Sequence, residues 1–376
     1  MGLSRYKLGE LIEQCDERNS HGLLSVDDVR GISTNKKFIE TKANMNGINV
    51  NSYKIVDTNQ FAYVADTSRR GDKIAIAYKK LEGAILVSSI YTVFTIKKNN
   101  LLSSDFLFIY FNRPEFDRYS RFNSWGSARE TFSWEDMCDM DIDLPPLAIQ
   151  QKYVNVYNAM VANQKAYERG LEDLKLTCDA YIEDLRRKMP CEKIGKYIKE
   201  VNEKNEGNAI SLFQGVNVDH IFTEPKRVAN DSANGSVVRT GQFAFNKVMK
   251  AHNTKLPIAL REGPDCVVSN SYQVFEVTNT KKLLPKYLLL WLNRDETQRY
   301  TGFISFGTTR DIFTFDDMKE ISIPLPDTSI QQSIVDIFTC CQTRSNINEK
   351  LKAQIKAICP ILIKGSIEEG SNTKEV

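Results

Sequence analysis

Residues 132–151 read Phe-Ser-Trp-Glu-Asp-Met-Cys-Asp-Met-Asp-Ile-Asp-Leu-Pro-Pro-Leu-Ala-Ile-Gln-Gln, and residues 313–332 read Phe-Thr-Phe-Asp-Asp-Met-Lys-Glu-Ile-Ser-Ile-Pro-Leu-Pro-Asp-Thr-Ser-Ile-Gln-Gln. The two stretches share their aromatic, acidic, Leu-Pro and Ile-Gln-Gln positions. They lie at one offset, because 313 − 132 = 331 − 150 = 181. This pattern predicts a tandem duplication, in which each copy ends in the same motif and then enters a long segment.

The segment after the first copy predicts a long helix. Gly170 is the only glycine or proline between Pro146 and Pro190, so the prolines mark the start and the end. Its apolar residues step alternately by four and three, which places them on one stripe of a helix that packs against another helix. The stripe contains one plainly polar residue, Gln164, and consists of Tyr153, Tyr157, Met160, Gln164, Tyr167, Leu171, Leu174, Cys178, Tyr181 and Leu185.

The segment after the second copy predicts the partner helix, over residues 327–366. Pro360 should bend this helix or end it early, and residues 367–376 read as a disordered tail. We expect the two helices to form an antiparallel coiled coil with pseudo-twofold symmetry. The second stripe is rougher, and it consists of Ile334, Phe338, Cys341, Ser345, Asn348, Leu351, Ile355, Ile358 and Leu362.

Each half before its helix predicts a mixed α/β (α+β) domain. Residues 6–19 read as a short amphipathic helix, and residues 192–205 repeat the pattern. Residues 106–121 and 286–300 read as further helices, which share an Asn-Arg pair and an Arg-Tyr pair. Short apolar runs broken by Gly, Asn and Asp read as strands and turns, at residues 55–56, 60–64, 73–77 and 85–94 of the first half and 242–245, 255–260 and 266–275 of the second.

The composition restricts the class of protein. A chain of 376 residues with 41% hydrophobic residues has room for two domains and a linking element. The formal charge of +2 means that a nucleic-acid site would depend on local basic patches. Eight cysteines without a C-x-x-C pair and three histidines give no zinc-ligand spacing and suit a reducing cytosol. With no signal core and no apolar run long enough for a membrane span, we expect a cytoplasmic protein.

A basic loop follows the strand that the halves share as Gln-Phe-Ala-aromatic. The sequences of the two loops differ, which suits two domains that bind similar polymers of different sequence. Phosphate contacts would position each domain, and the differing side chains would read base edges. An ordinary solvated turn explains either loop alone equally well. The candidate DNA-binding residues here are Arg69, Arg70 and Lys73 in the first half and Lys247, Lys250 and Lys255 in the second.

A second candidate loop occurs later in each half, as Gly-Ser-Ala-Arg at residues 126–129 and Gly-Thr-Thr-Arg at residues 307–310. Backbone amides, hydroxyls and an arginine of such a loop could bind a phosphate. The alternative, a tight turn before a strand, is equally consistent with the residues. The candidate DNA-binding residues are Ser127, Arg129, Thr308, Thr309 and Arg310.

The repeated Leu-Pro and Ile-Gln-Gln motifs, each opening a long helix after an α/β domain, resemble those of the specificity subunit of type I restriction-modification systems, along essentially the whole chain. The resemblance implies two target-recognition domains, residues 1–145 and 191–326, that each read half of a split, asymmetric DNA sequence. It also implies coiled-coil helices at 146–190 and 327–366, which set the spacing and dock two DNA adenine methyltransferase subunits. Asp327 in place of Pro146, Cys340, Cys341 and Pro360 depart from the family pattern.

No motif for catalysis is present. The sequence lacks a Phe-x-Gly-x-Gly cofactor loop, an Asn/Asp-Pro-Pro-aromatic motif, a Walker loop and H-E-x-x-H. We therefore expect a non-catalytic subunit without a cofactor of its own, and S-adenosylmethionine in the partner methyltransferase. The sequence leaves open the two half-sites and whether motor-nuclease subunits join the complex.

The Ile-Gln-Gln motifs are candidate partner-binding sites, through Gln150, Gln151, Gln331 and Gln332. Alternatively, these glutamines cap or solvate the start of each helix. For the whole chain, the second hypothesis is a non-catalytic coiled-coil scaffold whose domains bind protein partners. The near-neutral charge favours that hypothesis, but it leaves the divergence of the basic loops unexplained.

Overall fold

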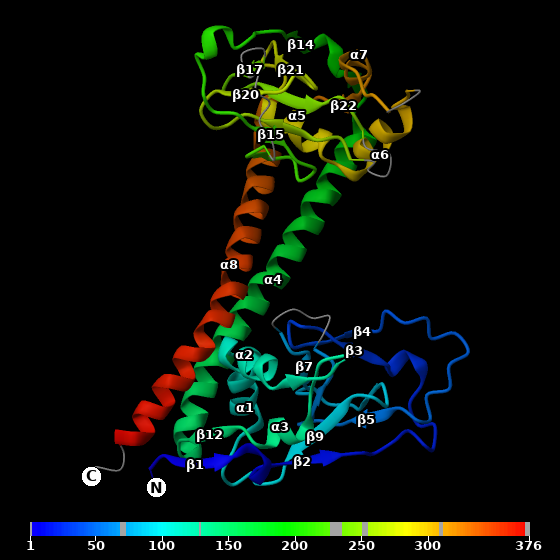
Figure 1. The fold of residues 1–376 in the computed structure, drawn as a ribbon. Coiled ribbons are helices and arrows are strands. Elements are labelled where there is room, and N and C mark those ends of the chain that lie inside the picture. The colour runs from blue at the N-terminus through cyan, green and yellow to red at the C-terminus, as the bar shows by residue number, and fades with distance from the viewer. Residues whose placement is uncertain are drawn as a thin grey trace. The chain divides into compact units, whose positions relative to one another are not determined.

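The computed structural model describes residues 2–67, 73–127, 129–225, 235–249, 255–307 and 311–372 (Figure 1). Internal contacts divide the chain into two compact units. Unit 1 comprises Met1–Tyr167 with Ile347–Val376, and unit 2 comprises Glu168–Asn346. Each of the two long helices therefore contributes one part to unit 1 and the other part to unit 2.

A four-stranded antiparallel sheet forms the centre of each unit, and the two sheets have the same strand order. Phe61 pairs with Phe94 in unit 1, and Phe243 pairs with Phe275 in unit 2. The sheet of unit 1 contains, in order, β2 (Ile12–Cys15), β9 (Thr92–Ile96), β6 (Phe61–Tyr63) and β7 (Ile76–Tyr78). That of unit 2 contains β14 (Ile198–Val201), β21 (Tyr272–Val277), β18 (Phe243–Asn246) and β19 (Ile258–Leu260).

Smaller antiparallel pairs surround each sheet, and among the described residues three of them correspond between the units. In unit 1 they are β1 (Ser4–Lys7) with β12 (Asp141–Leu144), β3 (Arg30–Ile32) with β4 (Phe38–Glu40), β5 (Lys54–Val56) with β8 (Ile85–Val87), and β10 (Ser124–Trp125) with β11 (Thr131–Phe132). In unit 2 they are β13 (Cys191–Lys193) with β22 (Ser322–Pro324), β15 (Gly215–Val216) with β16 (Phe222–Thr223), and β17 (Ser236–Val238) with β20 (Cys266–Val268).

The two faces of each sheet bury different side chains, because successive residues of a strand point to opposite faces. In unit 1, Phe61 and Phe94 join an aromatic core with residues of the helices. Ala62 and Val93 join a second core with residues of β3, β5 and β8. Unit 2 repeats this division between its aromatic and its aliphatic core. The helices therefore cover one face of each sheet. The other face is covered by β3–β4 and β5–β8 in unit 1 and by β15–β16 and β17–β20 in unit 2.

Each helix predicted at residues 106–121 and 286–300 is in fact a pair of shorter helices. Unit 1 has α1 (Ser104–Phe111) and α2 (Pro114–Phe122), and unit 2 has α5 (Pro285–Leu292) and α6 (Asp295–Ile304). The breaks fall at the shared Asn-Arg pairs, where Arg113 and Arg294 are extended. In the first pair Pro114 disfavours a helical conformation at the preceding residue.

The short helices predicted at residues 6–19 and 192–205 are wrong. Residues 6–19 instead contain the end of β1, a single 3-10 turn and β2, and residues 192–205 contain the end of β13, a similar turn and β14. The buried residues Leu8, Leu11 and Ile12 do follow a helical spacing. The flanking backbone nevertheless pairs with β12 and β9, so sheet pairing prevails over local periodicity.

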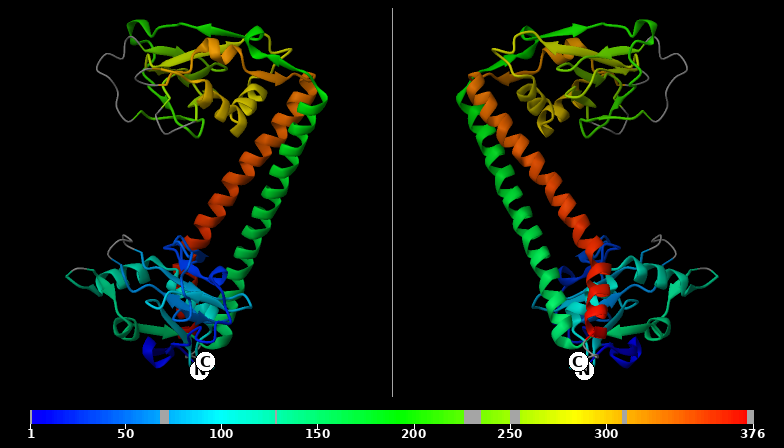
Figure 2. Two further views of the ribbon diagram at one scale, coloured as in Figure 1. Left: turned by 90° about the vertical axis from the view of Figure 1, so that its right-hand side faces the viewer. Right: turned by 90° about the vertical axis from the view of Figure 1, so that its left-hand side faces the viewer.

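The two long helices are α4 (Leu147–Lys188) and α8 (Thr328–Asn372), shown in Figures 1 and 2. Pro360 lies inside α8 and does not end it, so the predicted early end is wrong, as is the predicted tail for residues 367–372. Cys359, Leu362 and Ile363 are buried in the aromatic core of unit 1. This burial offsets the hydrogen bond that a proline removes from a helix, at a cost of about 3 kcal/mol.

The helices pack antiparallel within each unit, which confirms the prediction. In unit 1, Lys152 lies 2.8 Å from Glu369, and the amide of Gln164 donates to Asn348 at 2.9 Å. The residue number of the partner on α8 decreases as the residue number on α4 increases, so the two helices run in opposite directions. Gln164 and Asn348 are polar members of the two predicted stripes, and both are buried. A buried polar pair of this kind specifies the register of paired helices. No helix in the described part of the chain is long and apolar enough to cross a membrane.

Candidate nucleic-acid interface

Backbone hydrogen bonds join the two candidate loops of unit 1. The amide of Thr67 donates to the carbonyl of Glu130 at 2.9 Å, and the amide of Phe132 donates to the carbonyl of Ala65 at 2.9 Å. The loop that follows β6 therefore lies against the β10–β11 hairpin, although more than 50 residues separate them in sequence. The described ends of the two loops are therefore joined.

Unit 2 joins its candidate loops at the corresponding positions. The amide of Met249 donates to the carbonyl of Asp311 at 2.8 Å, and that of Phe313 donates to the carbonyl of Lys247 at 2.9 Å. The sequence analysis identified the loops separately and gave no reason to expect that they touch. Their pairing in both units defines one candidate interface per unit, built from two loops.

The predicted DNA-binding residues are only partly described. Lys73, Ser127 and Arg129 are exposed in unit 1. Lys255 is exposed and Lys247 is half-buried in unit 2. The other six candidates lie outside the described residues, and they are Arg69, Arg70, Lys250, Thr308, Thr309 and Arg310.

The loop of the β10–β11 hairpin requires glycine at Gly126. Its φ is +145°, and a Cβ atom there would lie 2.1 Å from the carbonyl oxygen of Arg129. An ion pair between Arg121 and Glu130 ties the hairpin to α2. The loop is thus a tight turn that also exposes Ser127 and Arg129, so the two interpretations of this sequence are compatible.

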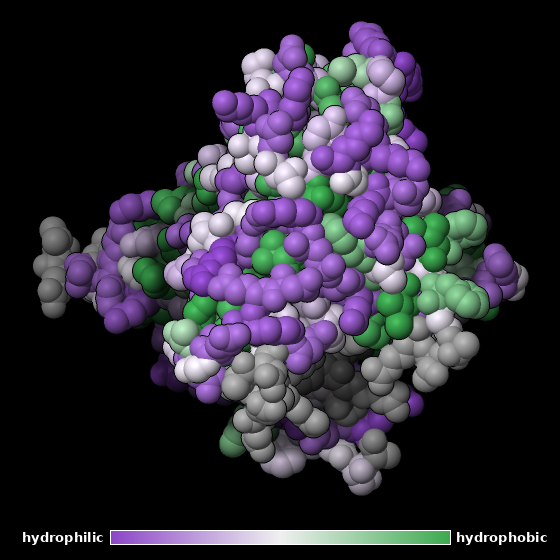
Figure 3. Space-filling view, turned by 90° about the horizontal axis from the view of Figure 1, so that it is seen from above, coloured by the Kyte–Doolittle hydropathy of each residue, from purple (hydrophilic) through white to green (hydrophobic). Residues whose placement is uncertain are grey.

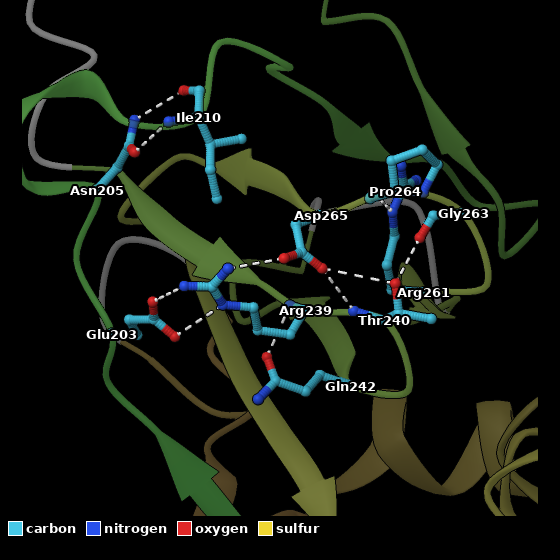
Figure 4. Close-up of polar contacts among 10 residues, drawn as sticks. All are labelled: Glu203, Asn205, Ile210, Arg239, Thr240, Gln242, Arg261, Gly263, Pro264 and Asp265. Carbon is cyan, nitrogen blue, oxygen red and sulfur yellow. Dashed lines mark hydrogen bonds and ion pairs between the residues drawn. The ribbon is translucent and has the colours of Figure 1, made fainter.

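Two other arginines of unit 2 have internal partners instead (Figure 4). Arg239 lies 2.7 Å from Asp265 and also pairs with Glu203. These carboxylates raise the pKa of Arg239, and Arg239 lowers the pKa of Asp265. Arg261 is buried and donates to the carbonyl of Pro264. Arg239 and Arg261 both bind groups within unit 2, and neither is a candidate phosphate ligand.

The partner-binding prediction is wrong for Gln150 and Gln331, because both side chains are fully buried and bonded within the chain. Gln150 accepts from the amide of Ser103 at 3.0 Å and donates to the carbonyls of Leu101 and Pro145. Gln331 makes the same three bonds 181 residues later, to Leu284, Lys282 and Pro326. These glutamines fasten each long helix to its domain, a role that neither the partner-binding prediction nor the alternative of capping or solvating the helix start described.

Gln151 and Gln332 have a different environment. Both are exposed. Gln151 donates to Asn155 at 2.8 Å and Gln332 donates to Asp336 at 2.7 Å, one helical turn further on. Their partner-binding role stays a prediction.

One feature of the interface was not predicted from the sequence. Trp125 and Phe306, which stand directly before the glycine of each hairpin loop, are strongly exposed. The signal for them was present, since both positions hold an aromatic residue at the 181-residue offset. Among the described residues, no group of three or more His, Cys, Asp or Glu side chains could hold a metal ion.

Comparison with known proteins finds a family match that lies in the second half of the chain. Residues 196–357 match the family model of the type I restriction modification DNA specificity domain. The specificity subunit of the type I restriction enzyme HindI from Haemophilus influenzae is 34% identical over 101 residues, which make up 26% of this chain. The match spans only 22% of the length of that relative.

Two solved structures share the fold. The S subunit of a type I restriction-modification system from M. genitalium has a TM-score of 0.58 at 11% identity, and the match covers 97% of this chain and 96% of that one. A chain from work on complex assembly and conformational transition of the type I R-M system has a TM-score of 0.52 at 16% identity, with 97% and 98% covered. At these identities the likeness concerns the fold alone.

Two similar domains on a pair of antiparallel helices, with a paired-loop surface in each, define a class of two-domain specificity proteins. Residues 196–357 of this chain form a type I restriction modification DNA specificity domain, and the chain has the fold of the solved type I S subunit.

Proposed function

We propose that this chain reads the DNA target of a type I restriction-modification complex. Each domain would read one half of a split, asymmetric sequence, and the two long helices would set the spacing between the halves. The observation that carries the proposal is the joining of the described ends of two candidate loops, at the same place in both units. A duplicated surface suits a target that has two parts.

Each surface would make two kinds of contact with DNA, one with phosphates and one with bases. Exposed Arg129 and the hydroxyl of Ser127 would bind phosphates and thereby fix the position of the domain on the duplex. Side chains of the loops that differ between the domains would reach base edges in the major groove. Different loops on one frame would then account for two different half-sites.

The partners would bind elsewhere on the chain. Two DNA adenine methyltransferase subunits, which carry S-adenosylmethionine, would dock on exposed faces of α4 and α8. Gln151 and Gln332 lie on such faces at the start of each helix. The complex would act in the cytoplasm, where it meets the chromosome.

The test is a methylation map of genomic DNA from cells that express this chain with its neighbouring methyltransferase, compared with cells that lack this chain. We expect a new N6-methyladenine signal at one split, asymmetric motif, which would also reveal both half-sites. If no motif appears while the same methyltransferase is active with another specificity subunit, the scaffold hypothesis replaces this proposal.

Substitutions test the phosphate contacts. In the assembled complex, Arg129→Ala and Lys247→Ala should each weaken DNA binding and lower the slope of log K against log salt by about 0.9, the value for one lost phosphate contact. Lys199→Ala is the matched control, because Lys199 is an exposed lysine paired with Glu276 at 2.9 Å. Equal slopes for all three variants and the wild type would remove these loops from the DNA interface.

A further inference from the structure

Each unit exposes two aromatic rings at the same place. Phe122 is 77% exposed and Trp125 is 67% exposed in unit 1, while Phe303 is 87% and Phe306 is 84% exposed in unit 2. The pairs correspond, since 303 − 122 = 306 − 125 = 181. Singly exposed apolar residues are common on proteins, and Figure 3 shows small separate hydrophobic patches on a mostly hydrophilic face. Their recurrence at one repeat offset is what makes these four residues unusual.

The rings stand at the entry to the candidate interface. Phe122 ends α2 and Trp125 opens the hairpin by pairing with Thr131. In unit 2, Phe303 lies in the last turn of α6, and Phe306 forms a bridge with Ile312. The two helices are labelled in Figure 1. Each exposed pair therefore precedes the loop that carries the predicted phosphate ligands.

The backbone beneath the rings is held firmly. The hydroxyl of Ser124 donates to the carbonyl of Ser120, and the side-chain amide of Asn123 donates to the carbonyl of Tyr119 at 2.9 Å. Ser305 repeats the first of these bonds by donating to the carbonyl of Thr301. Rings on a firm base lose little conformational entropy when they meet a ligand.

The surroundings of the rings favour nucleic acid over protein as the ligand. Trp125 and the exposed cation Arg129 lie on one hairpin, and proteins that contact DNA bases combine apolar side chains with cations for the phosphates. Two identical methyltransferase copies would meet two identical surfaces. The hairpins instead vary in detail, with Trp125 and Thr131 in one unit where Phe306 and Ile312 stand in the other.

We propose that Phe122 and Trp125 in unit 1, and Phe303 and Phe306 in unit 2, pack against the bases of duplex DNA beside the phosphate-binding loops. The proposal rests on the proposed function and adds an apolar contact to each half-site. The rings would meet thymine methyl groups or the faces of a partly opened base step. Because they carry no charge, they would release no counterions on binding.

This absence of charge gives a discriminating test. The assembled complex is titrated with a duplex containing its mapped target, at several salt concentrations. We expect Trp125→Ala and Phe306→Ala each to raise the dissociation constant by about 5- to 100-fold, as for the loss of an aromatic contact with a base. The salt slope should stay that of the wild type, in contrast to Arg129→Ala. Trp125→Phe keeps an aromatic ring at this position and should therefore retain most of the wild-type affinity.

The controls separate the other outcomes. Leu81→Ala removes an equally exposed apolar side chain of unit 1, at 76% exposure, from the turn that follows β7, and its affinity should not change. Unchanged affinity for Trp125→Ala and Phe306→Ala would overturn the proposal. Loss of methyltransferase from the complex would also overturn it, and would assign the rings to a protein interface. Failure of the proposed function is distinct, because the wild-type complex itself would then show no sequence preference.

Discussion

The two units hold corresponding hairpins in place with different chemistry. The turns between β3 and β4 and between β15 and β16 correspond, because Lys36 and His220 both donate their amide to the carbonyl three residues earlier. Both residues also have a positive φ, of 59° and 62°. Lys36 reaches the buried carboxylate of Asp117 on α2 at 2.7 Å. His220 reaches the carbonyl of Ile258 at 3.2 Å instead.

The same two backbone groups need partners in both units. In unit 1, Asp117 accepts from the amide of Ile74 at 3.3 Å, and Lys36 donates to the carbonyl of Phe111. In unit 2, Gln298 performs both tasks. It accepts from the amide of Leu256 and donates to the carbonyl of Leu292, both at 2.6 Å.

One neutral amide thus replaces a buried ion pair. The ion pair must overcome the desolvation of two charges, and burial lowers the pKa of Lys36 although Asp117 and its hydrogen bond act to raise it. In exchange, Lys36 ties the turn of the surface hairpin directly to the helices. The comparison teaches that the repeat preserves the need for hydrogen bonds at this place, and not the residues that supply them.

The largest effect should come from breaking the ion pair. Asp117→Ala leaves the charge of Lys36 buried without its partner and leaves the amide of Ile74 unpaired. We expect unit 1 to lose about 3–5 kcal/mol of stability. Hydrogen exchange of the Val64 amide, which donates to the carbonyl of Ala75 at 2.9 Å and keeps that partner in the variant, reports this loss locally. This readout avoids a two-state assumption for a chain with two compact units.

Gln298→Ala is the matched variant in unit 2. It leaves two backbone groups without a hydrogen-bond partner but leaves no charge unpaired. We therefore expect a smaller loss of stability, about 1–3 kcal/mol for an unsatisfied buried group. Exchange at the Asn246 amide, which donates to the carbonyl of Pro257 at 2.9 Å, is the readout. Equal losses in the two units would mean that the charges add nothing to the difference between them.

Replacing the ion pair of unit 1 by the neutral glutamine used in unit 2 should have an intermediate effect on stability. In the double variant Lys36→Met/Asp117→Gln, the new glutamine can accept from Ile74 and donate to Phe111, as Gln298 does in unit 2. Buried ion pairs can often be replaced by neutral groups at little cost, so we expect stability within about 1–2 kcal/mol of the wild type. If the double variant is as unstable as Asp117→Ala, the two helix positions are not interchangeable.

Much of this architecture could be predicted from the sequence because it depends on the repeat and on the local spacing of apolar residues. The 181-residue offset predicted the tandem domains. The four-three spacing predicted both long helices and placed Gln164 and Asn348 on their stripes. Strong periodicity over many turns leaves little room for another structure.

The remainder depends on contacts between distant residues. The segments at residues 6–19 and 192–205 have a helical spacing, but β12 and β22 bind their first residues in sheets. Lys36 and Asp117 lie 81 residues apart, and no pattern connects them. The joining of the candidate loops likewise depends on backbone bonds, which carry no signal in the side chains.

The smallest effect should be a pH dependence confined to unit 2. Burial, and then Lys255, lower the pKa of His220 below its usual value of 6.5, while its bond to Ile258 and the charge of Asp219 oppose the change. The unfolded chain therefore binds more protons than the folded chain between the lowered pKa and 6.5. Stability is fully present above 6.5 and falls as the pH decreases through that window.

Trp291 provides the probe, because it is the only tryptophan of unit 2. Its fluorescence can follow urea unfolding in a Trp125→Phe/Trp134→Phe background at a series of pH values. His220→Asn removes the titration and retains a residue that tolerates positive φ, so this part of the pH dependence should vanish. Unit 1 has Lys36 at the same turn position, and it should show no such loss in that window. An identical profile for the wild type and His220→Asn would mean that the imidazole is as easily protonated in the folded domain as in the unfolded chain.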